Sequence, residues 1–428
     1  MADFDGVVIG AGCAGCAAAT VLARAGKSVL LVERGTEAGS KNMTGGRIYT
    51  HALRPLFPDF EEEAPLERRI TCERISLMTG QDATTVEYLS PSLGDSGNAS
   101  YAVLRGPFDR WMADKAEQAG AECVFGITVD SLVREGSRVA GIRAGGDEIT
   151  ADAVILADGA NSLLVEEAGL GKRPQPHQMA VGVKETLALP SDVIDERFRS
   201  LPGEGTAWLF AGDATAGQVG GGFLYTNRES ISIGLVATLA DMSASQHALP
   251  DLLERFKHHP VVQPVVRGAE LVEFSGHMVP EGGLAMMPQL VGDGCLVAGD
   301  AAMLCVNLGY QVRGMDYALA SGRMAGESVL AALEAGDTSA AGLASYRQAM
   351  EASFVLQDMQ AYSRFPAFME GTKRIFDTYP QMASEMMQGL FRVDGSPGRP
   401  LRKKMMEPVR KVGIMTVLGD LRKGMKAL

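Results

Sequence analysis

The chain begins with alternating apolar strands and an alanine-rich stretch. Residues 5–9 and 28–32 are short apolar runs that predict buried strands, and residues 17–25 predict a helix between them. Gly10, Gly12 and Gly15 follow the first run at once. Glycines at this spacing permit a tight turn, close approach to a pyrophosphate and close packing of helix on strand. The pattern predicts a dinucleotide-binding βαβ unit.

An acidic residue completes the unit. Glu33 lies 18 residues after Gly15, where a carboxylate can accept hydrogen bonds from a ribose diol. The N-terminus of the helix would present free N–H groups to the phosphates. Cys13 and Cys16 have C-x-x-C spacing inside this loop, but their place at a phosphate site favours packing over a redox or metal role.

Two later strands end in glycine and aspartate, at Asp158-Gly159 and Gly299-Asp300. Glycine there allows close approach to a cofactor, and Asp300 would lie beside a ribityl chain. The three glycine motifs in this order resemble the FAD proteins typified by aromatic hydroxylases and geranylgeranyl reductases. The resemblance implies FAD and an α/β fold, with a Rossmann-like domain of the glutathione-reductase/aromatic-hydroxylase type.

Two predicted helices would serve this cofactor. Residues 106–119 form the first, on which Arg110 would face FAD, with a solvated arginine as the alternative. Residues 311–335 form the second, and its positive N-terminus would stabilise reduced flavin. Hydroxylases of this class have histidine where Met303 stands, which weakens a monooxygenase interpretation.

The middle of the chain alternates apolar and polar positions. Residues 217–225 and 230–238 predict neighbouring strands joined by a turn at 226–229. We expect an antiparallel sheet over the flavin. The predicted organisation is a discontinuous FAD domain, a quinone or substrate sheet domain, and a helical C-terminal region. The FAD domain comprises residues 1–75, 103–175 and 285–335. The sheet domain comprises residues 76–102 and 176–284, and the helical region comprises residues 336–428.

Composition narrows the class of protein. The 428 residues are 46% hydrophobic and carry a net charge of −12, which suits a large core and argues against nucleic acid as a partner. No secretory signal and no apolar run of about 18 residues is apparent, so we expect a cytoplasmic protein. Six cysteines are few, and none follows Cys305, which excludes a four-cysteine iron–sulfur set in the C-terminal third.

Several segments resemble electron-transfer-flavoprotein:quinone oxidoreductases, specifically their FixC branch. They are residues 39–49, with Lys41-Asn42 and Gly45-Gly46, and residues 181–185, 220–227, 277–283 and 307–316. The resemblance implies electrons accepted from an electron-transfer flavoprotein heterodimer and passed to a quinone at the inner face of the cytoplasmic membrane. It also implies a separate small ferredoxin-like subunit, no iron–sulfur cluster in this chain, and a complex that can bifurcate electrons from NADH.

The resemblance extends to individual residues. Gly220 and Gly221 match backbone that lies against the quinone ring, with a strand bulge as the alternative. Val219 stands where fused enzymes have tyrosine. His277 is a candidate to protonate quinone, although a histidine satisfied by local backbone is the plainer interpretation. The further expected cofactor contacts are Ala11, Ala14, Arg34, Lys41, Asn42, Gly45, Gly46, Arg47, Val129, Ala157, Gly309, Val312 and Gly314.

The last 30 residues carry a net positive charge, opposite in sign to that of the whole chain. Residues 399–428 contain nine Lys or Arg against Glu407 and Asp420, a net charge of +7, with apolar residues interleaved. Such a segment suits anionic lipid, an acidic partner or a solvated helix face. Two rival functions remain at this point: a prenyl reductase on the same fold, and a scaffold subunit in which FAD is structural.

Overall fold

The computed structural model describes residues 2–42, 46–95, 97 and 99–428. Its first sheet has a parallel core in the order β17-β10-β1-β2-β7. The core strands are β1 (Phe4–Ile9), β2 (Val29–Glu33), β7 (Glu122–Phe125), β10 (Asp147–Leu156) and β17 (Cys295–Val297). The antiparallel strands β8 (Val129–Glu135), β9 (Arg138–Ala144) and β16 (Val291–Gly292) extend it. The predicted α/β fold is confirmed.

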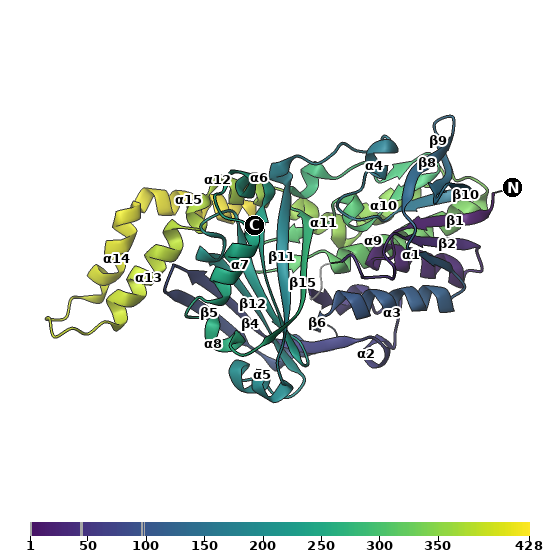
Figure 1. Ribbon diagram of the computed structural model, residues 1–428. Helices are drawn as coiled ribbons and strands as arrows, with labels where there is room; N and C mark the ends of the chain where they lie inside the picture. The colour runs from purple at the N-terminus through teal and green to yellow at the C-terminus, as the bar shows by residue number, and fades with distance from the viewer. Residues whose placement is uncertain (1, 43–45, 96, 98) are drawn as a thin grey trace.

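Helices α1 (Cys13–Arg24), α3 (Arg105–Gln118) and α9 (Met315–Ala335) pack on this sheet (Figure 1). The contact of α1 with α9 depends on small residues. A Cβ on Gly322 would lie 2.1 Å from the Ala14 carbonyl oxygen, and one on Gly326 2.9 Å from the Ala18 oxygen. The alanines of α1 are therefore needed for close packing as well as for helix propensity.

The second sheet has nine strands and runs β15-β11-β14-β13-β12-β4-β6-β3, with β5 paired to β4. Its strands are β3 (Gly46–Tyr49), β4 (Leu66–Met78), β5 (Ala83–Leu89), β6 (Ser100–Val103), β11 (Met179–Ala188), β12 (Glu204–Gly212), β13 (Gly220–Thr226), β14 (Ser230–Thr238) and β15 (Glu270–Pro280). The predicted antiparallel pair in residues 217–238 is confirmed as β13 and β14. The expected domain boundary at residue 75 lies within β4.

Helices α5 (Ser191–Phe198) and α7 (Leu249–Lys257) cover one face of the second sheet. Leu252, Leu253 and Phe256 of α7 are buried against it, and Phe210 meets Phe256 edge-on at 4.9 Å between ring centres. This core leaves the opposite face of the sheet toward the first domain.

Helix α9 begins later than predicted. The expected start at residue 311 is wrong, because β19 (Val312–Arg313) pairs with β18 (Val306–Asn307) and the helix follows at Met315. Arg313 then bonds Asp316 with Nε at 2.8 Å. This short hairpin places extended backbone, rather than helix, in front of the N-terminus of α9.

The C-terminal region is helical, as predicted. Helices α10 (Ala344–Ala352) and α11 (Phe354–Ala361) lie against α9, and α12 (Phe365–Gly371), α13 (Thr378–Phe391), α14 (Leu401–Val412) and α15 (Ile414–Ala427) follow. Helix α13 packs against β4 and β5 of the second sheet, and Figure 1 shows α14 projecting beyond it, away from the two sheets. Asp420 holds α15 in place by accepting from Arg374 at 2.7 Å and Tyr379 at 2.6 Å. Within the described residues, no helix has both the length and the apolarity to cross a bilayer.

Candidate functional site

A cavity of about 1020 Å³ is lined by residues of both sheets. The glycine loop after β1 lies at one end. Helix α12 lies on the side away from β1 (Figure 1), and β13, β15 and the hairpin β18–β19 also contribute to the lining. A space of this size exceeds what a single small metabolite fills and suits a dinucleotide with room beyond its ring.

The glycine loop is built as the spacing predicts. Gly10 has φ +100°, and a Cβ there would lie 2.4 Å from the Ala157 carbonyl oxygen. A Cβ on Gly15 would lie 1.8 Å from the Gly10 oxygen, whereas one on Gly12 would meet nothing within 4 Å. No side chain caps the N-terminus of α1. Free N–H groups and open space therefore meet at Gly12, as a phosphate requires.

Glu33 lines the cavity at the end of β2 and is held in place by the loop. One carboxylate oxygen accepts from Ala11 N at 3.0 Å, and the other accepts from Gly35 N at 2.7 Å. A carboxylate has about four acceptor positions, so these bonds leave capacity for a ribose diol. The loop and the acid thus form a single hydrogen-bonded unit.

On α3, the arginine that lines the cavity is Arg105, not Arg110. Arg105 donates to both carboxylate oxygens of Asp109, at 2.9 and 2.8 Å, and Asp109 has no exposed surface. Asn42 donates to the same aspartate. Arg110 is 52% exposed, pairs with Glu37 and lies outside the cavity. In the sequence, the four-residue spacing of Arg105 and Asp109 places both on one helix face and could have indicated that Arg105 is the paired arginine.

Two carboxyl groups face the cavity with raised affinity for protons. Burial raises the pKa of Asp158 to about 6, and burial also raises the pKa of Asp300. The Oδ1 atom of Asp158 is buried and has no hydrogen-bond partner among the residues that the structure describes. A buried acceptor of this kind calls for a donor. The hydroxyl groups of FAD would supply one, so these residues fit the cofactor.

Most predicted contacts come together at this cavity. Ala11 and Gly15 belong to the loop but do not line it, and Gly45 lies outside the described residues. Those that line it are Gly10, Gly12, Ala14, Glu33, Arg34, Lys41, Asn42, Gly46, Arg47, Val129, Ala157, Asp158, Gly159, Gly220, Gly221, His277, Gly299, Asp300, Gly309, Val312 and Gly314.

The glycine pair on β13 lines the far end. A Cβ on Gly220 would lie 2.0 Å from the Val236 oxygen, and one on Gly221 2.5 Å from the Phe210 oxygen. Their pairing with β14 is continuous, so the alternative of a bulge at this point is wrong. The sheet itself requires both glycines, and their backbone faces the cavity as well.

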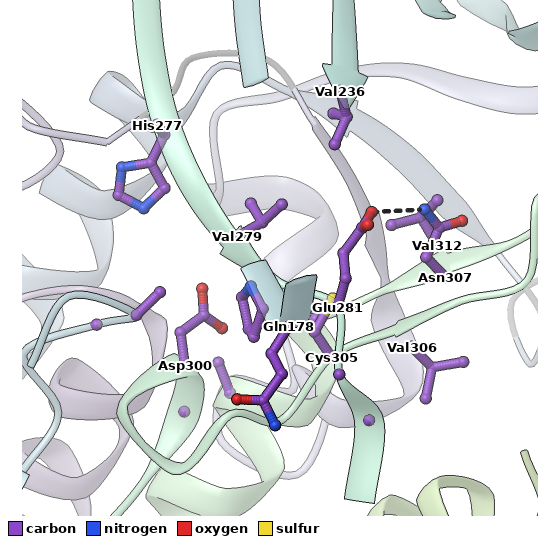
Figure 2. Close-up of a pocket in the computed structure, with 18 of the residues that line it drawn as sticks. Gln178, Val236, His277, Val279, Glu281, Asp300, Cys305, Val306, Asn307 and Val312 are labelled. Atoms are coloured by element: carbon purple, nitrogen blue, oxygen red, sulfur yellow. Dashed lines mark hydrogen bonds between the residues drawn. The ribbon is translucent and has the colours of Figure 1, made fainter. Parts of the chain in front are cut away.

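His277 and Glu281 also line the cavity (Figure 2). Burial and the positive charges of Arg105 and Arg34 lower the pKa of His277. Burial raises the pKa of Glu281 to about 7. Glu281 lies in a segment that resembles the family, but no sequence pattern marked it as a site residue, because only the fold turns this charged side chain into the cavity.

Known proteins match the whole chain. Residues 3–198 match an FAD binding domain, 105–328 an FAD dependent oxidoreductase and 365–428 the ETF-QO/FixC family C-terminal domain. The chain is 49% identical over 425 residues to the probable electron transfer flavoprotein-quinone oxidoreductase YdiS of Escherichia coli (strain K12), covering 99% of each chain. The chain belongs to the ETF-QO/FixC family. Protein FixC of the same strain is 47% identical over 99% of each chain.

This ETF-QO/FixC member is therefore an FAD-dependent electron-transfer oxidoreductase. Its fold is shared more widely. A geranylgeranyl bacteriochlorophyll reductase-like protein of Thermoplasma acidophilum has a TM-score of 0.73 at 18% identity, covering 98% of this chain and 99% of that one. At this identity the likeness speaks for the fold alone. Across the described residues, no cluster of His, Cys, Asp and Glu is arranged to hold a metal ion.

Proposed function

We propose that this chain accepts electrons from an electron-transfer flavoprotein heterodimer and passes them through its FAD to a membrane quinone. The observation that best supports this proposal is the full-length identity of 49% to a probable electron transfer flavoprotein-quinone oxidoreductase, together with a cavity that extends beyond a dinucleotide site. When bound, FAD supplies the redox chemistry, and the protein supplies binding, orientation and protons. Arg105, Glu33, Asp158 and Asp300 would hold the cofactor.

The far end of the cavity supports a lipophilic acceptor. Phe365, Phe368 and Met369 of α12 line it there. Helix α15 lies against the same helix, since a Cβ on Gly424 would be 3.1 Å from the Phe368 ring. A quinone leaving a lipid surface at α15 would therefore have a short apolar route toward the flavin.

The C-terminal arm, defined as residues 391–428, supports peripheral contact with the inner face of the cytoplasmic membrane. Its net charge is positive, and large apolar side chains are exposed on it. Phe391 is 79% exposed, Val393 92% and Met415 80%. Anionic lipid attracts such a segment with roughly 1 kcal/mol per basic residue near the surface.

Vesicle flotation tests this contact on the full chain. Met415→Asp combined with Leu418→Asp should abolish binding to phosphatidylglycerol vesicles while FAD content stays unchanged. Leu201, 67% exposed and far from the arm in sequence, gives the matched control Leu201→Asp. If the wild type, the double variant and Leu201→Asp float equally, the proposed contact between the C-terminal arm and the membrane is wrong.

The complex that we propose includes a small ferredoxin-like subunit that carries the iron–sulfur cluster. This chain would then hold one FAD and no iron. If the electron-transfer flavoprotein bifurcates electrons from NADH, this chain would carry the branch that leads to quinone. Copurification with both partners, and iron analysis of each subunit, checks this composition. Iron bound to the isolated chain would contradict it.

Steady-state quinone reduction, with reduced electron-transfer flavoprotein as the electron donor, distinguishes the proposed function from a prenyl reductase and from a scaffold subunit. We expect reduced electron-transfer flavoprotein to drive quinol formation that depends on this chain. Saturation of geranylgeranyl lipids without quinone reduction would instead favour a prenyl reductase. A flavin that stays oxidised when reduced partner is added would favour the scaffold role.

A further inference from the structure

Glu281 follows directly on β15 and turns into the apolar end of the cavity. Figure 2 shows its carboxyl directed at Asn307, whose partner across the β18–β19 hairpin is Val312. Asn307 Nδ2 donates to Glu281 Oε1 at 3.3 Å, and Asn307 Oδ1 accepts from Gly309 N at 3.0 Å. The second bond orients the amide, so that its NH₂ group faces the carboxyl. Glu281 is thereby held in place whether or not it carries a proton.

The carboxyl has no cationic partner within the described part of the chain. The titratable groups labelled around it are His277 from its own strand, Asp300 from the turn at Gly299–Ala302 and Cys305 before β18. From α12 and the turn after it, Glu370 and Lys373 line the same cavity. Burial raises the pKa of Glu281 to about 7, against the lowering effect of Asn307.

His277 is less suited to give up a proton near neutral pH. Its pKa is lowered by burial and by two arginines, so the neutral imidazole prevails there. Burial and the charges of Asp300 and Glu281 raise the pKa of Cys305 and keep it as a thiol. With a pKa of about 7, Glu281 can both hold and release a proton near neutral pH.

We propose that Glu281 donates a proton to the quinone as electrons arrive from the flavin, a role that rests on the proposed function. Conversion of a quinone to a quinol takes up two electrons and two protons. The anionic form of reduced FAD, when bound, would supply both electrons and one proton. The second proton passes from Glu281 Oε2 to a quinone oxygen, so that the carboxyl O–H bond breaks as the quinol O–H bond forms. A proton taken up from bulk solvent then restores the carboxyl group.

Glu281→Gln tests the role, because the amide keeps the shape and still accepts from Asn307. Pre-reduced protein is mixed with a short-chain quinone between about pH 5 and about pH 9. The wild-type rate should fall as pH rises through about 7. The variant should be about 10²-fold slower and independent of pH. Glu334→Gln, on the exposed end of α9, is the matched control with wild-type behaviour.

A spectroscopic readout keeps the test separate from turnover. The infrared C=O stretch of a protonated carboxylic acid should titrate near pH 7 in the FAD-loaded wild type and be absent in Glu281→Gln. Glu281→Asp retains a carboxyl. If the glutamine substitution impairs folding, Glu281→Asp should still show both the band and a pH-dependent rate.

The outcomes distinguish two failures. A wild-type protein that reduces no quinone at any pH would overturn the proposed function and, with it, this role. A wild type that reduces quinone beside a Glu281→Gln variant with the same rate, pH profile and infrared band would overturn the inference alone.

Discussion

The two parts of the cavity differ in the residues that line them. Around the loop after β1, glycines, the N-terminus of α1 and the Arg105–Asp109 ion pair converge, and a side chain at Gly10 or Gly15 would clash with backbone. Around β13 and β15, valines and phenylalanines line the cavity together with Glu281, which Asn307 holds in place. The first part suits a charged cofactor held permanently, and the second suits a neutral ring that comes and goes. We therefore propose that FAD is bound mainly around the glycine loop and that proton transfer takes place at Glu281.

The largest expected effect comes from the first part. Gly10→Val should eliminate FAD binding, because its Cβ would press on the Ala157 oxygen at a φ that side chains rarely adopt. Gly26→Val is the matched control: it also has positive φ, +75°, but open space around it. Flavin absorbance per purified chain measures the difference. Full FAD content in Gly10→Val would contradict the assignment of this loop.

The next effect separates two neighbouring arginines. Arg105→Ala leaves Asp109 buried without its cation and should lower the free energy of unfolding by about 3 kcal/mol or more. Arg110→Ala removes an exposed pair and should cost about 0–1 kcal/mol. Urea unfolding and flavin titration of both variants provide the measurement. Similar losses in the two would show that α3 faces the cavity differently.

These two arginines illustrate how far the sequence leads. Glycine spacing and Glu33 predicted the βαβ unit, because the tight turn and the close packing of helix on strand require glycine at fixed positions, and such a local requirement is visible in the sequence. The start of α9 depends on β18–β19 pairing, which local patterns do not show. The inward arginine left only the four-residue spacing of Arg105 and Asp109 as a trace in the sequence. Glu281 looks like an ordinary polar residue until β15 places it opposite Asn307.

A smaller effect follows from pH. The pKa of Asp158 is raised to about 6 in the fold, so the folded state binds its proton more tightly than the unfolded chain does. Its contribution to stability is therefore present at low pH and is lost as pH rises from about 4 to about 6. Unfolding of the flavin-free protein should show this loss in wild type but not in Asp158→Asn. Parallel pH profiles of the two proteins would contradict the burial of this group.

The smallest expected effect lies at the apolar end. Val279→Thr keeps the volume of the side chain but adds a hydroxyl to the wall on β15. We expect quinone KM to rise by about two- to tenfold with FAD content unchanged, since an apolar wall discriminates only modestly. Measured quinone KM and flavin content together check this. A loss of FAD in Val279→Thr would place the cofactor ring farther along the cavity than we infer.

The central claim is that this chain relays electrons from flavoprotein to quinone. The most direct measurement is rapid mixing of the FAD-loaded chain with reduced electron-transfer flavoprotein, followed by quinone, with flavin absorbance as the signal. We predict that the flavin of this chain bleaches in the first step and recovers in the second as quinol forms. A flavin that never bleaches, or that bleaches and is not reoxidised by quinone, would contradict the claim.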